Sequence, residues 1–460
     1  MANFWDFEVW SWIFLIGALL GSLLVGNMLK KGIPFLRNSL IPTSVLGGGI
    51  LLIVAAIYKG ITGDVMFDTA AFGGNGTEAL EIITYHTLAL GFIASTLKTT
   101  EGVMNKKRTH EILNTGVTTV STYLLQGIAG LGITMIAARV ISGFFPAAGV
   151  LLPFGYGQGT GQALNYGSIY EADFGFVGGR SFGLTIAALG FLSAALGGVF
   201  HLNLAKKRGR LIPSRRTDGS LHTERIESEQ EIPMQASVDK MTVQMALIFV
   251  AYIGAYLLMR LFGSLLPSMK SVIYGFNFLL GVLMATLLKV TMNLLHKMKI
   301  VKKKYTNNFL MTRVSNFFFD IMVVAGVAAI RLDILQNYWG IILILGAVGA
   351  VLTFLYNRFV AKVLFKDYAE EQFLMMYGML TGTASTGIIL LREVDQDFKT
   401  PASDNLVYQN FPTIVLGFPM MFLATLAPVK PLLTLGIFVA FFVVLNVLLF
   451  RSKLFRRKSK

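Results

Sequence analysis

Long apolar segments separated by short polar stretches recur along most of the chain. Each segment approaches the roughly 20 residues that a helix needs to cross a bilayer, and none alternates every second residue as a barrel strand would. The pattern therefore predicts an all-α polytopic membrane protein. We expect its spanning helices at about 10–28, 40–58, 82–98, 112–142, 178–204, 241–262, 271–295, 309–330, 337–361, 404–426 and 431–450.

Two segments interrupt this pattern, since both are rich in glycine and small polar residues although apolar helices flank them. The first, at about 150–172, contains FGYGQGTGQALNYG, and the second, at about 373–396, contains MMYGMLTGTASTG. Irregular backbone at membrane depth is tolerated only where protein or a water-filled cavity covers it. The two segments are therefore candidates for a ligand site, although single glycines in them could equally serve close helix packing.

Basic residues gather in the polar stretches between the apolar segments. The positive-inside rule assigns these groups to the cytoplasm and explains the net charge of +15 without a nucleic-acid partner. They share one side of the membrane only if each glycine-rich segment enters and leaves by the same face. The sequence therefore predicts two re-entrant hairpins, with the N-terminus outside and the C-terminus in the cytoplasm. The basic groups are Lys30–Arg37, Lys98–Arg108, Lys206–Arg216, Lys297–Lys304 and Arg451–Lys460.

Composition narrows the possible chemistry. Hydrophobic residues make up 54% of the 460 residues and charged residues only 14%, with a mean hydropathy of +0.64. The chain has no cysteine, which excludes thiol chemistry and disulfides. Its five histidines show no zinc-type spacing, and no nucleophile–base pair or phosphate-binding loop is recognisable. We therefore expect neither an enzyme nor a bound cofactor.

The two halves of the chain read as repeats of opposite orientation. Each half has four predicted spans, a hairpin and one further span, but the first begins outside and the second inside. Inverted repeats with interrupted helices at equivalent positions are typical of secondary transporters. The expected organisation is a first repeat at 1–205, a charged linker at 206–240, a second repeat at 241–427, and an additional helix with a basic tail at 428–460.

The polar residues of the two hairpins are the main candidates for the site. Hydroxyls and backbone carbonyls suit a desolvated sodium ion, and helix N-termini offer N–H groups to a carboxylate. The candidate substrate contacts are Gln158, Gly159, Thr160, Gln162, Asn165, Thr383, Ser385, Thr386, Arg392, Asn405 and Gln409. The candidate sodium ligands are Thr160, Thr381, Gly382, Thr383 and Asp320.

Four of these candidates have a second interpretation. Arg392 could capture a carboxylate or pair with its acidic neighbours at the end of the hairpin. Asp320 lies within a predicted span, where it could bind an ion, pair with a nearby side chain or reach the membrane surface. The polar stripe that includes Asn405 and Gln409 could contact substrate or another helix.

Several motifs resemble those of the bacterial sodium/glutamate symporters. The resemblance is clearest in GQGTGQALNYG (157–167) followed by GFVGGRSFGLTIAALGFLSAALGGV (175–199), and it extends to LIPTSVLGGGILL (40–52). TGTASTGIILLREVD (381–395) is similar to the second re-entrant segment of that family in position and character. Gln158 stands where the family usually has histidine, and Gly161 and Gln162 replace small alanine-like residues.

This resemblance covers roughly residues 10–427 and implies a function. It implies a sodium-coupled symporter of the bacterial cytoplasmic membrane that imports glutamate or a related small carboxylate. The implied mechanism is an elevator, in which a transport domain moves against a scaffold domain that forms a homodimer. The alternative is an ion or small-solute channel that uses the same hairpins as a filter.

Overall fold

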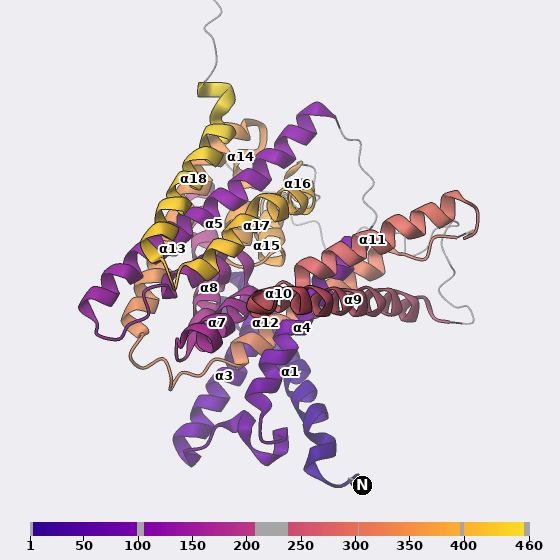
Figure 1. The fold of residues 1–460 in the computed structure, drawn as a ribbon, viewed down its shortest axis with the longest axis vertical. Helices are drawn as coiled ribbons and strands as arrows, with labels where there is room; N and C mark the ends of the chain where they lie inside the picture. Colours follow the sequence, from indigo (N-terminus) through magenta and orange to yellow (C-terminus); the bar gives the residue numbers. More distant parts are fainter. Residues whose placement is uncertain (1–2, 99–104, 208–237, 302, 396–399, 455–460) are drawn as a thin grey trace, which may run out of the picture. The chain divides into compact units, whose positions relative to one another are not determined.

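The computed structural model describes residues 3–98, 105–207, 238–301, 303–395 and 400–454. Every regular element in these ranges is a helix (Figure 1), which confirms the expected all-α class. The charged linker expected at 206–240 lies almost wholly outside the described residues, as do residues 455–460 of the basic tail.

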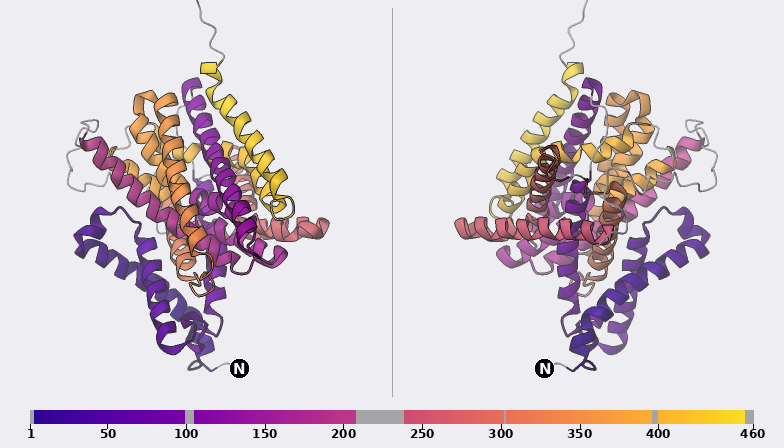
Figure 2. Two further views of the ribbon diagram at one scale, coloured as in Figure 1. Left: turned by 90° about the vertical axis from the view of Figure 1, so that its left-hand side faces the viewer. Right: turned by 90° about the vertical axis from the view of Figure 1, so that its right-hand side faces the viewer.

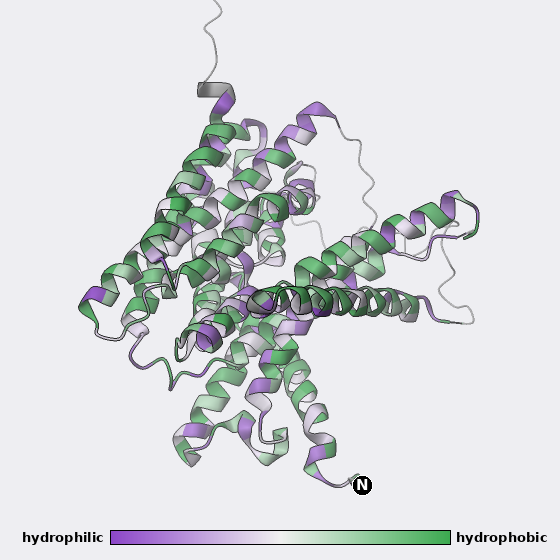
Figure 3. Ribbon diagram, viewed as in Figure 1, coloured by the Kyte–Doolittle hydropathy of each residue, from purple (hydrophilic) through white to green (hydrophobic). Residues whose placement is uncertain are grey.

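Ten described helices are long and apolar enough to cross a membrane, and Figure 3 colours much of their length as hydrophobic. All ten coincide with predicted spans, so the chain is a multi-pass helical membrane protein. They are α1 (Phe7–Gly32), α3 (Thr43–Thr62), α4 (Gly76–Leu97), α5 (Lys106–Val140), α8 (Gly179–Lys207), α9 (Lys240–Leu265), α11 (Asn277–Lys297), α12 (Asn308–Ala328), α13 (Trp339–Leu364) and α18 (Pro431–Leu454).

The remaining predicted span is bent. Helices α16 (Ala402–Tyr408) and α17 (Asn410–Leu426) meet at an angle of 50° and together have the length of one span. Pro412 explains the break, because it cannot donate to the carbonyl of Tyr408 and its ring crowds that group. The predicted helix at 271–295 is also interrupted, since the short α10 (Lys270–Gly275) precedes α11.

The chain divides into two compact units. The first contains Met1–Leu80, Met104–Ser214 and Gly326–Lys460. In this unit α1 and α3 lie side by side (Figure 2), because small residues line their contact. A Cβ added to Gly47 would lie 3.1 Å from the carbonyl oxygen of Ser22.

The second unit contains Glu81–Val103 and Arg215–Ala325, and therefore most of α4 together with α9, α10, α11 and most of α12. Its apolar core is formed by helix faces that include Ile93, Ile248 and Met311. Polar bonds add to this packing, since the hydroxyl of Ser315 on α12 donates to the carbonyl of Gly91 on α4 at 3.0 Å.

Candidate functional site

The first glycine-rich segment forms two helices that fold back on each other. Helix α6 (Leu151–Gln158) and helix α7 (Thr160–Phe174) are separated by Gly159, whose φ of +81° and ψ of −172° strongly favour glycine. The rings of Phe154 and Tyr166 stack with their centroids 3.8 Å apart, so α7 returns along α6. The expected interruption of the helix therefore occurs at a glycine.

The second glycine-rich segment has the same form. Helix α14 (Ala369–Thr381) is followed by Gly382 and by Thr383, which begins helix α15 (Ala384–Arg392). A Cβ on Gly378 would lie 2.9 Å from the Cα of Gly387, so the two helices touch through glycine backbone. The hydroxyl of Thr383 accepts a hydrogen bond from the N–H of Thr386 at 3.4 Å, which caps α15.

The tips of the two hairpins meet inside the first unit. A Cβ added to Gly159 would lie 3.5 Å from Cγ2 of Thr383 and 3.7 Å from the carbonyl oxygen of Gly382. Four helix ends therefore converge: the C-termini of α6 and α14, and the N-termini of α7 and α15. Helix C-termini attract cations and helix N-termini attract anions, so the junction offers both polarities at once.

Two side chains of α5 bind the carbonyl ends of the broken helices. The hydroxyl of Tyr123 donates to the carbonyl of Gly157 on α6 at 3.1 Å. The side-chain amide of Gln126 donates to the carbonyl of Leu380 on α14 at 3.0 Å and to Oγ1 of Thr353 on α13 at 2.8 Å. Residues of α5 therefore contact both hairpins at their tips.

Helix α8 supports the hairpins from another side through its glycines. A Cβ on Gly183 would lie 2.5 Å from the carbonyl oxygen of Ala163 on α7, and one on Gly190 would lie 2.4 Å from that of Thr381 on α14. Any larger residue at these two positions would push a hairpin away. The small residues of α8 therefore allow both hairpins to approach that helix closely.

Several predicted site residues gather around the tips. Thr160, Gln162 and Asn165 are buried on the first two turns of α7, beside half-buried Gln158 and buried Gly159. On the other hairpin, Thr381, Gly382, Thr383, Ser385 and Thr386 follow one another across the break. The junction therefore brings together ten of the predicted positions.

One buried amide group without partners lies in the same region. Gln162 is 1% exposed, and neither its nitrogen nor its oxygen has a hydrogen-bond partner among the described residues. Leaving a buried polar group unpaired costs about 1–3 kcal/mol, so such groups in native proteins call for an explanation. A bound polar ligand at the junction would supply the missing partners.

Arg392 and Asp320 are not among these ten residues. Arg392 is exposed at the last residue of α15, about 13 Å along the helix axis from the tip at Thr383. Asp320 is exposed on α12 and belongs to the second unit.

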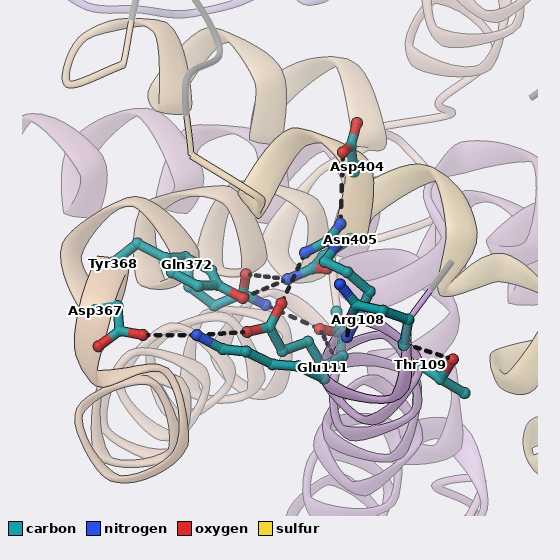
Figure 4. A network of polar contacts seen from close by, with 11 residues as sticks. Arg108, Thr109, Glu111, Asp367, Tyr368, Gln372, Asp404 and Asn405 are labelled. Carbon is teal, nitrogen blue, oxygen red and sulfur yellow. Dashed lines mark hydrogen bonds and ion pairs between the residues drawn. The ribbon is translucent and has the colours of Figure 1, made fainter. Parts of the chain in front are cut away.

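Asn405 belongs to a polar network at the base of the second hairpin, the end where α14 begins (Figure 4). Its amide donates to the hydroxyl of Tyr368 at 3.0 Å and to Oε1 of Gln372 at 3.1 Å. Gln372 in turn donates to Oγ1 of Thr115 on α5 at 3.1 Å. These contacts match the helix–helix interpretation of the polar stripe. Gln409 lies nearer the tip, with its amide nitrogen 3.4 Å from Sδ of Met379.

A charged cluster also fixes the base of the second hairpin. Glu370, in the first turn of α14, accepts hydrogen bonds from Arg358 on α13 at 2.7 Å and binds Nε2 of His201 on α8 at 2.6 Å. Burial raises the pKa of Glu370, but the hydrogen bonds from His201 and Arg358 outweigh it and hold that pKa at about 2. The cluster ties three helices together, and no sequence motif had marked it.

Comparison of the chain with protein-family models and with curated proteins gives no match. Assignment of a function therefore depends on the residues and geometry of the hairpin junction.

Proposed function

We propose that the protein is a sodium-coupled secondary transporter that imports glutamate or a related small carboxylate by alternating access. The observation that carries the proposal is the contact between Gly159 and Thr383, the tips of two broken helices from opposite halves of the chain. Interrupted helices that meet between repeats form the substrate sites of many secondary transporters.

The chemistry of the junction suits a carboxylate. Gly159 has no side chain with which to cap α7, so the first turn of that helix can direct N–H groups and its positive dipole end at an anion. The amide of Gln162 has both a donor and an acceptor to offer a ligand such as an amino acid. The hydroxyls of Thr160 and Thr386 are additional candidate contacts.

The packing within each unit is consistent with an inverted repeat. The first two long helices of each half pack against each other, α1 with α3 and α9 with α11. Each hairpin then follows the fourth long helix of its half, α5 or α13. The proposal includes an elevator-type movement, a homodimer in the bacterial cytoplasmic membrane, and an N-terminus outside with the C-terminus in the cytoplasm.

Uptake into proteoliposomes tests this function. Purified full-length protein is reconstituted, and uptake of labelled glutamate, aspartate and dicarboxylates is measured with an inward sodium gradient and with choline in its place. We expect saturable uptake that requires sodium. Flux that does not saturate and needs no gradient would instead indicate a channel, and no flux of any acid would overturn the proposal.

A matched pair of variants connects this activity to the junction. Thr383→Ala removes the cap of α15 at the tip, whereas Thr425→Ala removes a hydroxyl that donates, within the described part of the chain, to the carbonyl of Phe422 on α17. We expect uptake per folded protein to fall about tenfold or more in Thr383→Ala, a loss of about 1.4 kcal/mol. Thr425→Ala should transport normally, and equal activities would contradict the role of the tip.

A further inference from the structure

Helices α5 and α13 of the first unit share a ladder of buried polar side chains. Thr122 and Gln126 lie one turn apart on α5, and Thr353 and Asn357 lie one turn apart on α13; all four are 0% exposed. Gln126 bonds to Oγ1 of Thr353, while the amide of Asn357 donates to the carbonyl of Thr353 at 2.9 Å and to Oγ1 of Thr122 at 3.3 Å.

Two oxygens of this ladder have no donor. Oε1 of Gln126 and Oδ1 of Asn357 are buried and lack a hydrogen-bond partner among the described residues. Their amides cannot be turned round without loss, since an oxygen would then face the carbonyl of Leu380 or of Thr353. Each oxygen therefore lies on the side of its amide that makes no hydrogen bond, where it can accept from or coordinate a ligand.

The surroundings favour a positive ligand at Oε1 of Gln126. A Cβ on Gly157 would lie 3.4 Å from Oε1 of Gln126, which places that oxygen beside the C-terminal turn of α6. The same amide is bonded to Leu380 in the last turn of α14. The C-termini of two helices thus add their negative dipole ends to the site.

The ligand set also indicates the charge of the ion. The two unpaired oxygens belong to neutral amides, and no group of three or more acidic, histidine or cysteine residues suited to a metal occurs among the described residues. Neutral oxygens suit a hard cation, but a divalent ion in a buried site would lack compensating charge. A monovalent cation fits better.

We infer that a sodium ion binds between α5 and α13, at Oε1 of Gln126 and Oδ1 of Asn357, on the side of the hairpin tips where α6 and α14 end. This inference rests on the proposed transport function, whose coupling ion it locates. It assigns the cation to residues of α5 and α13 and leaves the N-terminal ends of α7 and α15 to the carboxylate. Cation and anion then neutralise each other across the same junction.

A sodium titration without substrate tests the site. The melting midpoint of the full-length protein in detergent is followed as sodium replaces choline at constant ionic strength, because a ligand that binds the folded state raises this midpoint. The variant is Asn357→Ala and its control is Asn446→Ala. The control is matched because Asn446 on α18 also donates to the carbonyl four residues earlier, that of Phe442, at 2.8 Å, while its own Oδ1 already accepts from the hydroxyl of Tyr356 at 2.8 Å.

We expect Asn357→Ala to need about tenfold more sodium, or more, for half of the shift, whereas Asn446→Ala should follow the wild type. If Asn357→Ala is not recovered folded, Asn357→Ser removes Oδ1 but keeps a hydroxyl that can donate to the carbonyl of Thr353 four residues earlier, so it should weaken sodium binding in the same way. A wild-type midpoint that ignores sodium would mean that the oxygens hold only water and would overturn the site. Wild-type sodium dependence in the Asn357 variants would overturn it as well.

These results separate the site from the transport function. Sodium-driven uptake combined with unchanged sodium dependence in the variants would refute the site alone. A sodium-dependent midpoint that Asn357→Ala weakens, without uptake of any acid by the wild type, would refute the transport function and leave the cation site.

Discussion

Tyr123 holds the end of α6 through both its hydroxyl and its ring. The hydroxyl donates to the carbonyl of Gly157 at 3.1 Å, and the ring fills the space that a side chain on Gly157 would need. A Cβ built on that glycine would lie 2.2 Å from Cε1 of Tyr123. The position of the first hairpin tip against α5 therefore depends on the absence of one methyl group.

Gly157→Ala should accordingly destabilise the protein. Replacing glycine by alanine inside a helix normally stabilises it by up to about 1 kcal/mol, but here the methyl group must displace a buried ring, which costs about 1–3 kcal/mol. The melting midpoint in detergent should fall below that of Gly49→Ala, a control in α3 where a Cβ would meet nothing within 4 Å. Equal midpoints for the two variants would contradict this prediction, because the ring of Tyr123 would then move aside at little cost.

Gln162→Leu should separate stability from substrate binding. Its amide has no hydrogen-bond partner among the described residues, so an apolar side chain of similar size should leave the melting midpoint unchanged or raise it. The same change should raise the KM for the transported acid about tenfold or more, because a ligand contact is lost. A tenfold change corresponds to about 1.4 kcal/mol of binding free energy.

The control for that variant is Gln372→Leu at the base of the second hairpin. Gln372 donates to Thr115 and accepts from Asn405, so its loss should lower the midpoint by the equivalent of about 1–3 kcal/mol. Unchanged KM in Gln162→Leu would remove Gln162 from the list of substrate contacts.

We expect protonation of the Glu370 carboxylate to make the folded protein less stable in acid. Its pKa in the folded protein is about 2, below the ordinary value of 4.5, so the carboxylate stabilises the fold fully above pH 4.5. This contribution is lost as the pH falls from 4.5 toward 2, and we expect about 2 kcal/mol after allowance for solvent around a half-buried group.

Glu370→Gln isolates that contribution. The variant should be less stable than the wild type at pH 7, since Arg358 loses its carboxylate partner, and the gap should narrow below pH 4.5. Melting midpoints from pH 3 to 7 measure the gap, with Asp367→Asn as a control because the Asp367–Lys107 pair is largely exposed. A gap that stays constant with pH would refute the assignment.

The long helices and the two glycine-rich interruptions could be predicted from the sequence. Apolar length located all ten long helices, and the glycines at 159 and 382 marked where α6 and α14 end. The bend between α16 and α17 was not predicted, although Pro412, a residue without an N–H donor, marks its place in the sequence. These features are local, since helix length, a positive φ and a missing N–H donor depend on nearby residues.

The polar framework around the tips was harder to predict because its bonds are not local. Gln126 binds Leu380 and Thr353, which are far from it in the sequence, and nothing in the chain pairs them in advance. A signal was nonetheless present, since Thr122 and Gln126 put polar groups on one face of a span. The same kind of stripe predicted a role for Asn405, whose amide bonds to Tyr368 and Gln372. A polar stripe therefore identifies an inward face without distinguishing a ligand contact from a helix contact.

The contact between Gly159 and Thr383 also has a consequence for biosynthesis. A ribosome that adds about 5–20 residues per second reaches the second tip roughly 220 residues, or on the order of 10–40 s, after the first. During that interval α5 already carries Gln126, but Leu380 and Thr353 do not yet exist. The first hairpin is therefore synthesised well before the residues that contact its tip, and the polar groups of that tip have no partners from the second half of the chain during this interval.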